Sequence, residues 1–514
     1  MLRALSTVGG FTLMSRILGL AREIFMAAFL GTSIVTDAFY LALRLPNMFR
    51  RIFGEGAFNS AFVPLFGREI AEGDIDGAHR FARNAFAWLG GVLLLATLIL
   101  IPGMNWFGKL IAPFAKPDTY ELVVSFGRIM FSYLLCMALS AHLSGVLNTL
   151  NVFSAPAFAP VLLNVLMLIV LAIIVPLAHL QDQLVTIGTL VSWSVCAAGF
   201  AQLCLLWVVA WRKGVKIYPV IPKMTPKIKR LALLMGPGVL AAGIQQVNLL
   251  VGSAIASSKE SAVSALNFAD RLFQMPNGLI GVAFGVVLLP EITRLLRTGD
   301  EDGANESIGR GVLFSMLLTL PAAVAFVMTP SSFVVPIYER GKFAIDGSAG
   351  PVSMALAAFA AGLPAYVLIK VLQAGYFARE NTKSPMKLAI VTVTVNTIAS
   401  VVLFRWIGFV GIAIATSLAG WLNVVLLAHG LRGSMGITPE RKSQLFRVLL
   451  AALAMGVVVW FSARLMEPWF SSGIEWLRIS AMLLLVAAGG AIYGALALVL
   501  KATSLAELKA GFKR

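Results

Sequence analysis

Repeated apolar segments of about twenty residues limit, more than any other feature, what this chain can fold into. Residues 85–104 read AFAWLGGVLLLATLILIPGM, and residues 161–180 read VLLNVLMLIVLAIIVPLAHL. A helix of this length, rising about 1.5 Å per residue, crosses roughly 30 Å of hydrocarbon. The segments do not alternate apolar and polar residues, as the strands of a membrane barrel do. The sequence therefore predicts an all-α polytopic membrane protein.

The distribution of charge agrees with this class. Only 13% of the residues are charged, against about 25% in soluble globular proteins. The net charge is +17, but most lysines and arginines lie in short connections between apolar segments rather than in one patch. This pattern indicates membrane topology, and we expect no nucleic-acid partner.

Fourteen membrane-spanning helices are predicted. They start near residues 9, 37, 84, 122, 156, 187, 231, 266, 309, 350, 386, 409, 444 and 477. An even number of spans places both termini on the same side. The connection at 211–230 carries seven lysines and arginines, whereas those at 31–36 and 179–183 carry none. The excess of basic residues in cytoplasmic loops predicts that both termini are cytoplasmic.

The sequence also contains an internal repeat. Residues 44–64, RLPNMFRRIFGEGAFNSAFVP, recur with one gap as RLFQMPNGLIGVAFGVVLLP at 271–290, and 145–156 is echoed more weakly at 375–385. Both pairs are about 230 residues apart, as expected of two transporter repeats in the same orientation. This predicts two six-helix lobes related by a pseudo-two-fold axis, at 1–215 and 216–433, and two extra C-terminal helices at 434–514.

Several charged residues lie inside the predicted spans. Arg16 and Arg22 lie about 10 Å and 20 Å into the first one. The second helix is expected to run from Asp37 to about residue 66. The acidic and basic residues along one face of this helix are Asp37, Arg44, Arg51 and Glu55. Its repeat partner carries Asn267, Asp270, Arg271 and Gln274 at the same kind of helical spacing.

These buried cations outnumber the buried acids. Each arginine at a helix centre costs about 2.5–3.5 kcal/mol unless it is compensated. The cations are Arg16, Arg22, Arg44, Arg50, Arg51 and Arg271, and the acids are Glu23, Asp37, Glu55 and Asp270. Internal ion pairs account for some of them, but the surplus favours a water-filled cationic cavity. Because arginine binds phosphate in bidentate fashion, we expect a cargo with phosphate or another multi-oxygen anion.

Other chemistry has weaker support. The DxD in EGDIDG (72–77) lies in a short connection without a catalytic domain, and the four histidines are scattered along the chain. We therefore expect no enzymatic activity, metal or cofactor. Lys370, in the tenth span, is either a cavity residue or a lysine near a helix kink. Two alternatives remain: an exporter of another lipid-linked oligosaccharide or amphipathic compound, and a membrane-embedded polyprenyl-phosphate enzyme.

Four segments carry a family resemblance. They are SRILGLARE (15–23), DAFYLALRLPNMFRRIFGEGAFNSAFVP (37–64), GVLNTLNVFSAPAFAPVLLN (145–164) and ADRLFQMPNGLIGVAFGVVLLP (269–290). The chain resembles, over essentially its whole length, the MurJ (MviN) family of lipid II flippases in the multidrug/oligosaccharidyl-lipid/polysaccharide (MOP) exporter superfamily. The resemblance implies a bacterial inner-membrane transporter that moves lipid II between leaflets by alternating access during peptidoglycan synthesis, without a cofactor. It also implies that the last two helices form a groove for the undecaprenyl tail. Membrane lipids are expected partners, and other cell-wall synthesis proteins are left open as partners.

The resemblance also implies roles for particular residues. The substrate-binding residues are Arg16, Arg22, Arg44, Arg50 and Arg271, and the supporting or gating residues are Glu23, Asp37, Asn47, Glu55, Asp270, Gln274 and Arg447. Arg44 occupies the family's cavity-lysine position. Many members have a glutamate where this chain has Gln274, which cannot titrate. Helical spacing favours Arg51 in the cavity, whereas the resemblance favours Arg50.

Overall fold

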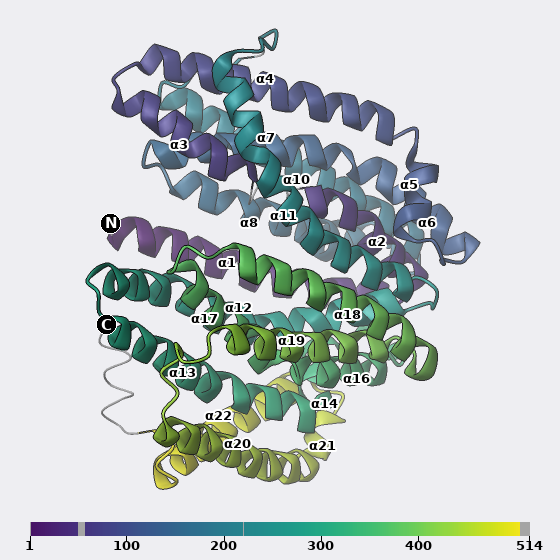
Figure 1. Ribbon diagram of the computed structural model, residues 1–514. Coiled ribbons are helices and arrows are strands. Elements are labelled where there is room, and N and C mark those ends of the chain that lie inside the picture. Colours follow the sequence, from purple (N-terminus) through teal and green to yellow (C-terminus); the bar gives the residue numbers. More distant parts are fainter. Residues whose placement is uncertain (1, 50–56, 219, 504–514) are drawn as a thin grey trace. The chain divides into compact units, whose positions relative to one another are not determined.

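The computed structural model describes residues 2–49, 57–218 and 220–503, and throughout this part of the chain every regular element is a helix (Figure 1). The described residues form two compact units. The first comprises the residues up to Ser264 together with Arg340–Asp346. The second comprises Ala265–Glu339 and the residues from Gly347 onward.

The first unit is a bundle of long helices. Its elements are α1 (Leu2–Leu30), α2 (Ile34–Phe49), α3 (Ala57–Ala71), α4 (Ile75–Leu100), α5 (Met104–Ile111), α6 (Pro117–Met130), α7 (Ser132–Thr149), α8 (Ser154–Ile169), a π-helical turn (Val170–Ile174), α9 (Val175–Leu177), α10 (Leu184–Arg212), α11 (Pro226–Ala256) and α15 (Gly341–Ile345). α10 packs against α7 and α8, α1 packs against α8, and α2 packs against α6. These contacts bury the apolar faces of the helices. α1 lies beside α8 and α2, and both of these helices carry polar side chains.

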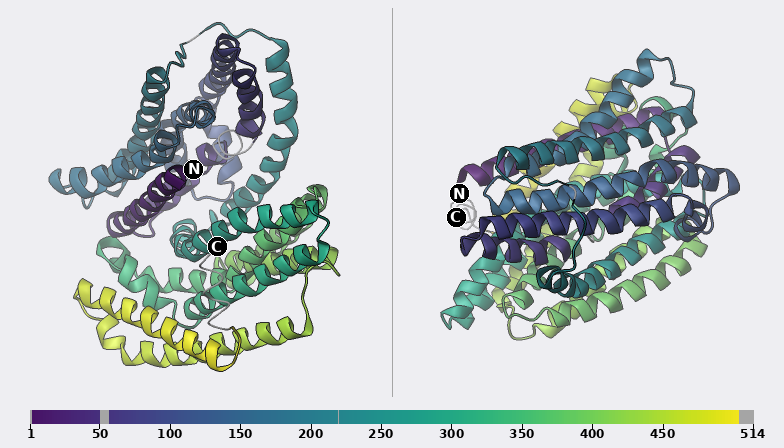
Figure 2. Two further views of the ribbon diagram at one scale, coloured as in Figure 1. Left: turned by 90° about the vertical axis from the view of Figure 1, so that its left-hand side faces the viewer. Right: turned by 90° about the horizontal axis from the view of Figure 1, so that it is seen from above.

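The second unit is a bundle of the same kind. After α12 (Ala262–Arg297), which begins in the first unit, it contains α13 (Glu301–Met328), α14 (Ser331–Tyr338), α16 (Ala349–Ala360), α17 (Leu363–Phe377), α18 (Lys383–Ile407), α19 (Val410–Gly430), α20 (Pro439–Leu465), α21 (Glu467–Phe470) and α22 (Glu475–Val499). α18 packs along α19, and α13 packs against both α17 and α20. α20 and α22 lie side by side, as Figures 1 and 2 show.

The helices confirm a polytopic membrane protein. Among the described residues, ten helical segments are long and apolar enough to cross a membrane. The other four predicted spans start in α1, α2, α11 and α12, so the total of fourteen stays a prediction. α11, which was predicted to open the second lobe, belongs to the first compact unit. The lobe boundaries at 215/216 and 433/434 rest on the sequence repeat and also stay predictions.

One loop occurs twice with the same local structure. Residues 73–78 read GDIDGA and residues 299–304 read GDEDGA. The leading glycine has φ of 82° in one copy and 77° in the other. Asp74 and Asp300 each cap the following helix by accepting a hydrogen bond from the amide three residues on, at 2.7 and 2.8 Å. This match supports two copies of one unit, and it gives the first aspartate of the DxD a structural role as a helix cap.

The connection between α14 and α16 belongs to a different compact unit from those two helices. Residues Arg340–Asp346 belong to the first unit, where α15 lies against α1. Gly341 has φ of 48°, and a Cβ there would overlap the carbonyl oxygen of Ala28. The ring of Phe343 is fully buried. This connection is therefore a specifically packed segment that requires glycine at its start.

Candidate functional site

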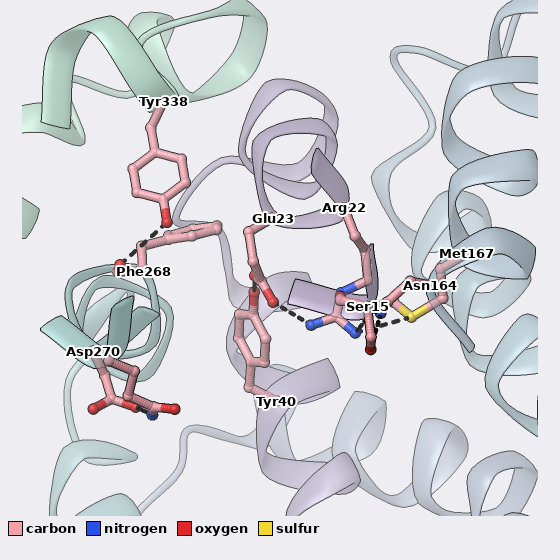
Figure 3. A network of polar contacts seen from close by, with 10 residues as sticks. Ser15, Arg22, Glu23, Tyr40, Asn164, Met167, Phe268, Asp270 and Tyr338 are labelled. Atoms are coloured by element: carbon pink, nitrogen blue, oxygen red, sulfur yellow. Dashed lines mark hydrogen bonds and ion pairs between the residues drawn. The ribbon is translucent and has the colours of Figure 1, made fainter. Parts of the chain in front are cut away.

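Arg22 on α1 is the centre of a buried polar network (Figure 3). Its Nη1 donates to Oδ1 of Asn164 at 3.0 Å and lies 3.9 Å from Sδ of Met167, both on α8. Its Nη2 donates to Oε1 of Glu23 at 2.5 Å. The Arg22 side chain is 11% exposed. The guanidinium is thus held by a carboxylate on one side and a neutral amide on the other.

Glu23 joins this network to α2. Its side chain is only 2% exposed, and its Oε2 accepts a hydrogen bond from the hydroxyl of Tyr40. A buried carboxylate is stable only when its oxygens are paired and hydrogen-bonded. Arg22 balances the charge of Glu23, and Tyr40 satisfies its second oxygen.

Asn164 links the arginine to a second point on α1. Its Nδ2 donates to the carbonyl oxygen of Ser15 at 3.0 Å, while its Oδ1 accepts from Arg22. Asn164 is not among the site residues predicted from the sequence. The available signal was an amide within the apolar span 154–177, because a buried polar side chain in such a span needs a partner.

Asp37 on α2 is buried and contacts the beginning of α12. Its Oδ1 accepts a hydrogen bond from the backbone N–H of Ser264 at 2.7 Å. The first amides of a helix have no partner within the helix, and the helix dipole favours an anion there. Asp37 thus caps α12 from another helix.

The other predicted residues of the first unit have different environments. Arg16 is exposed on α1, while Arg44 and Asn47 are half-buried on α2. Arg16 precedes Arg22 by six residues, which places the two arginines on different faces of the helix. The predicted residues Arg50 and Glu55, with the alternative Arg51, lie outside the described residues.

A second polar cluster lies in the second unit on α12 and α17. The carboxylate of Asp270 accepts a hydrogen bond from the amide of Gln274, one helical turn along α12. Arg271, beside it in sequence, is half-buried. Lys370 on α17 donates to Oδ1 of Asn277 at 3.3 Å and to its backbone carbonyl at 3.4 Å. The structure thus joins Lys370 to α12 through Asn277, which is not among the residues predicted from the sequence.

Two further contacts stabilise the second unit. The hydroxyl of Tyr338 on α14 donates to the carbonyl oxygen of Phe268 on α12 at 3.3 Å (Figure 3). Arg447 on α20 donates from Nη1 to the carbonyl oxygen of Lys501, just after α22, at 3.2 Å. The predicted supporting residue Arg447 therefore joins the two C-terminal helices. Within the described residues, no group of three His, Cys, Asp or Glu side chains could hold a metal ion.

The fold of the chain matches that of solved membrane transporters. The described helices match an inward-facing multidrug-resistance MATE transporter of the MOP superfamily with a TM-score of 0.70, at 14% identity over 82% of this chain and 94% of that one. They also match a structure of the lipid II flippase MurJ in an inward closed conformation, with a TM-score of 0.79, at 22% identity over 96% and 98% of the two chains. The protein therefore has the fold of MOP-superfamily transporters.

Sequence comparison gives the family within this class. The model of the family described as lipid II flippase MurJ matches residues 26–479. A probable lipid II flippase MurJ of Rhizobium tropici is 42% identical over 99% of this chain and 96% of its own length. A lipid II flippase MurJ of Burkholderia cenocepacia is 34% identical over 84% and 83%. The chain belongs to the MurJ lipid II flippase family, which confirms the resemblance.

Proposed function

We propose that this protein moves lipid II from the cytoplasmic to the outer leaflet of the bacterial inner membrane by alternating access, with both termini in the cytoplasm. The observation that carries the proposal is the buried Arg22–Glu23–Asn164 network in a member of this family. Lipid II carries a diphosphate next to its sugars. A guanidinium oriented inside a membrane span is suited to that group, because two parallel N–H donors match two phosphate oxygens.

The geometry of the network suggests how binding would proceed. In the described arrangement, Nη2 of Arg22 is occupied by Glu23. An arriving phosphate oxygen would replace Oε1 of Glu23, while Asn164 keeps the guanidinium oriented and Tyr40 keeps its bond to Glu23. Glu23 thus stabilises the arginine when no substrate is bound. The exchange lets the site release the diphosphate, because a competing anion remains beside it.

The remaining predicted residues extend this proposal. Arg16, Arg44, Arg50 and Arg271 would contact the diphosphate and the neighbouring sugar oxygens, forming a cationic cavity. Glu23, Asp37, Asn47, Glu55, Asp270, Gln274 and Arg447 would support them or adjust the helices during transport. Two observations support this extension: Arg44 is half-buried on α2, and Arg271 is half-buried beside the Asp270–Gln274 pair on α12.

A reconstituted transport assay tests the proposal. Purified protein in liposomes would be given fluorescent lipid II, and the fraction reaching the opposite leaflet would be measured over time. Arg22→Ala should slow transport by about 10- to 100-fold, the range expected when a hydrogen bond to a charged group is lost. Arg22→Lys, which keeps the charge but loses the planar fork, should have an intermediate rate.

Arg68→Ala is the matched control. Arg68 is an exposed arginine in the last turn of α3, and its ion-pair partner Glu72 directly follows that helix. Surface pairs of this kind contribute little to stability, so transport should be unchanged. Wild-type rates in the Arg22→Ala protein would contradict the proposed role of Arg22. Equal transport of a different undecaprenyl-linked oligosaccharide by the wild type would show a broader exporter.

A further inference from the structure

The connection between α10 and α11 is a basic segment with a defined structure. Residues 211–230 contain seven lysines and arginines and no acidic residue. We name residues 213–218 with 220–225 the basic strap. It belongs to the first unit, as α4 does. Its charge alone is explained by membrane topology, but the way it is fastened and what it exposes require a further explanation.

The basic strap is held on α4 by specific bonds. Asn84 pairs with the backbone of Lys223 in both directions, Nδ2 to the carbonyl oxygen at 2.6 Å and the Lys223 amide to Oδ1 at 2.8 Å. Trp88 donates from Nε1 to the same carbonyl oxygen at 3.1 Å. The guanidinium of Arg83 lies 4.6 Å from the ring centre of Tyr218. These contacts give the strap a fixed face toward α4.

The exposed side chains of the strap include three cations. Val215 and Ile217 of the strap are buried. The lysines of the strap, Lys213, Lys216 and Lys223, are all exposed. Lys227 follows the strap in sequence, and its Nζ forms an ion pair with Oε2 of Glu69 at 2.5 Å. The outward charge of the strap therefore comes from its own three lysines.

Two apolar side chains protrude beside Lys223. Ile221 is 84% exposed and Met224 is 64% exposed. The apolar run of α4 starts at residue 85, so Trp88 lies one turn inside it and brings Lys223 to the level where α4 enters the hydrocarbon. Apolar tips among lysines at this depth are typical of segments that lie in the membrane interface.

We propose that the basic strap binds the headgroups of anionic phospholipids in the leaflet it faces. Lysines close to an anionic membrane surface attract phosphate headgroups, and the attraction adds up over the three side chains. Ile221 and Met224 would insert at the boundary between headgroups and acyl chains. This surface is separate from the Arg22 network and does not depend on the proposed transport activity.

Photocrosslinking of the full chain tests the proposal. The photoreactive residue p-benzoylphenylalanine replaces Ile221, and the protein is placed in nanodiscs of phosphatidylcholine with a minor share of phosphatidylglycerol. Mass spectrometry then identifies the crosslinked lipid. Phosphatidylglycerol should be over-represented several-fold relative to its share in the disc. This enrichment should fall at high salt, because interactions between exposed charges are screened.

Three comparisons make the experiment decisive. Combined Lys213→Gln, Lys216→Gln and Lys223→Gln substitutions should return the crosslinked lipid to the bulk ratio. The corresponding three Lys→Arg substitutions should keep the enrichment and show that the strap still folds. The same probe at Leu177 should give the bulk ratio, because this side chain is 76% exposed but the connection that follows, at 179–183, has no basic residue. A bulk ratio at Ile221 in the wild type, or crosslinks only to protein, would overturn the proposal.

Discussion

The guanidinium of Arg22 donates a 3.0 Å hydrogen bond to the side-chain oxygen of Asn164, which joins α1 and α8 across 142 residues of sequence. A neutral amide orients the guanidinium without cancelling its charge, whereas Glu23 supplies the counter-charge at 2.5 Å. The two partners therefore have different roles, and substitution can separate them.

Asn164→Ala should lower both stability and transport. It removes a hydrogen bond to a charged group, which is worth about 1.5–3 kcal/mol, and leaves the buried arginine less well oriented. The midpoint of thermal unfolding in detergent and the rate of lipid II transport in liposomes measure the two effects.

Asn164→Asp separates orientation from charge. The carboxylate keeps an acceptor for Arg22, but it loses the donor to the Ser15 carbonyl oxygen and adds a second anion that competes with phosphate, so transport should fall further than in Asn164→Ala. Gly19→Ala is the control, because its Cβ would lie 3.8 Å from the Asn164 amide, an ordinary contact. Wild-type transport by Asn164→Asp would rule out competition between anions.

Tyr40→Phe should weaken the network through Glu23. The hydroxyl donates to the buried Glu23 carboxylate, and its loss should cost about 1–3 kcal/mol of the free energy of unfolding. Denaturation of Tyr40→Phe, Glu23→Gln and the double variant gives the coupling energy between the two side chains. An additive double variant would show that the hydroxyl does not act through Glu23.

Gly341→Ala should destabilise the packing of residues 340–346 more than Gly347→Ala does. Both glycines have positive φ, 48° and 63°, so an alanine at either position adopts a backbone conformation that costs about 1–2 kcal/mol. Only at Gly341 would the new Cβ also overlap Ala28, whereas nothing lies within 4 Å at Gly347. Protease cleavage within 340–346 should be faster in Gly341→Ala. Equal cleavage in the two variants would mean that the close approach to α1 is not maintained.

Asp74→Ala and Asp300→Ala should have nearly equal effects. Each removes the same helix cap in one copy of the repeated loop, at about 0.5–2 kcal/mol per cap. Asp76→Ala and Asp302→Ala are the controls, since these acids lie in the first turn of the helix and should contribute less. Thermal unfolding measures all four, and clearly different losses for the two caps would contradict their structural equivalence.

Much of the fold was predictable because hydropathy is a local property. An apolar run of about twenty residues favours insertion into the hydrocarbon of a membrane as a helix, wherever it lies in the chain. The ten apolar spans follow from that property. The repeated GDxDGA loop is also visible in the sequence, but only the structure shows that its first aspartate caps a helix in both copies.

The sequence by itself determined that this chain is a helical membrane transporter whose spans contain more arginines than acids. Only the tertiary structure decided which groups meet. Arg22 donates to Asn164, and Asp37 accepts from the first turn of α12. Likewise, α15 packs on α1. The reason is physical. A hydrogen bond requires two atoms within about 3 Å, and helix packing alone brings residues more than 100 positions apart to that distance.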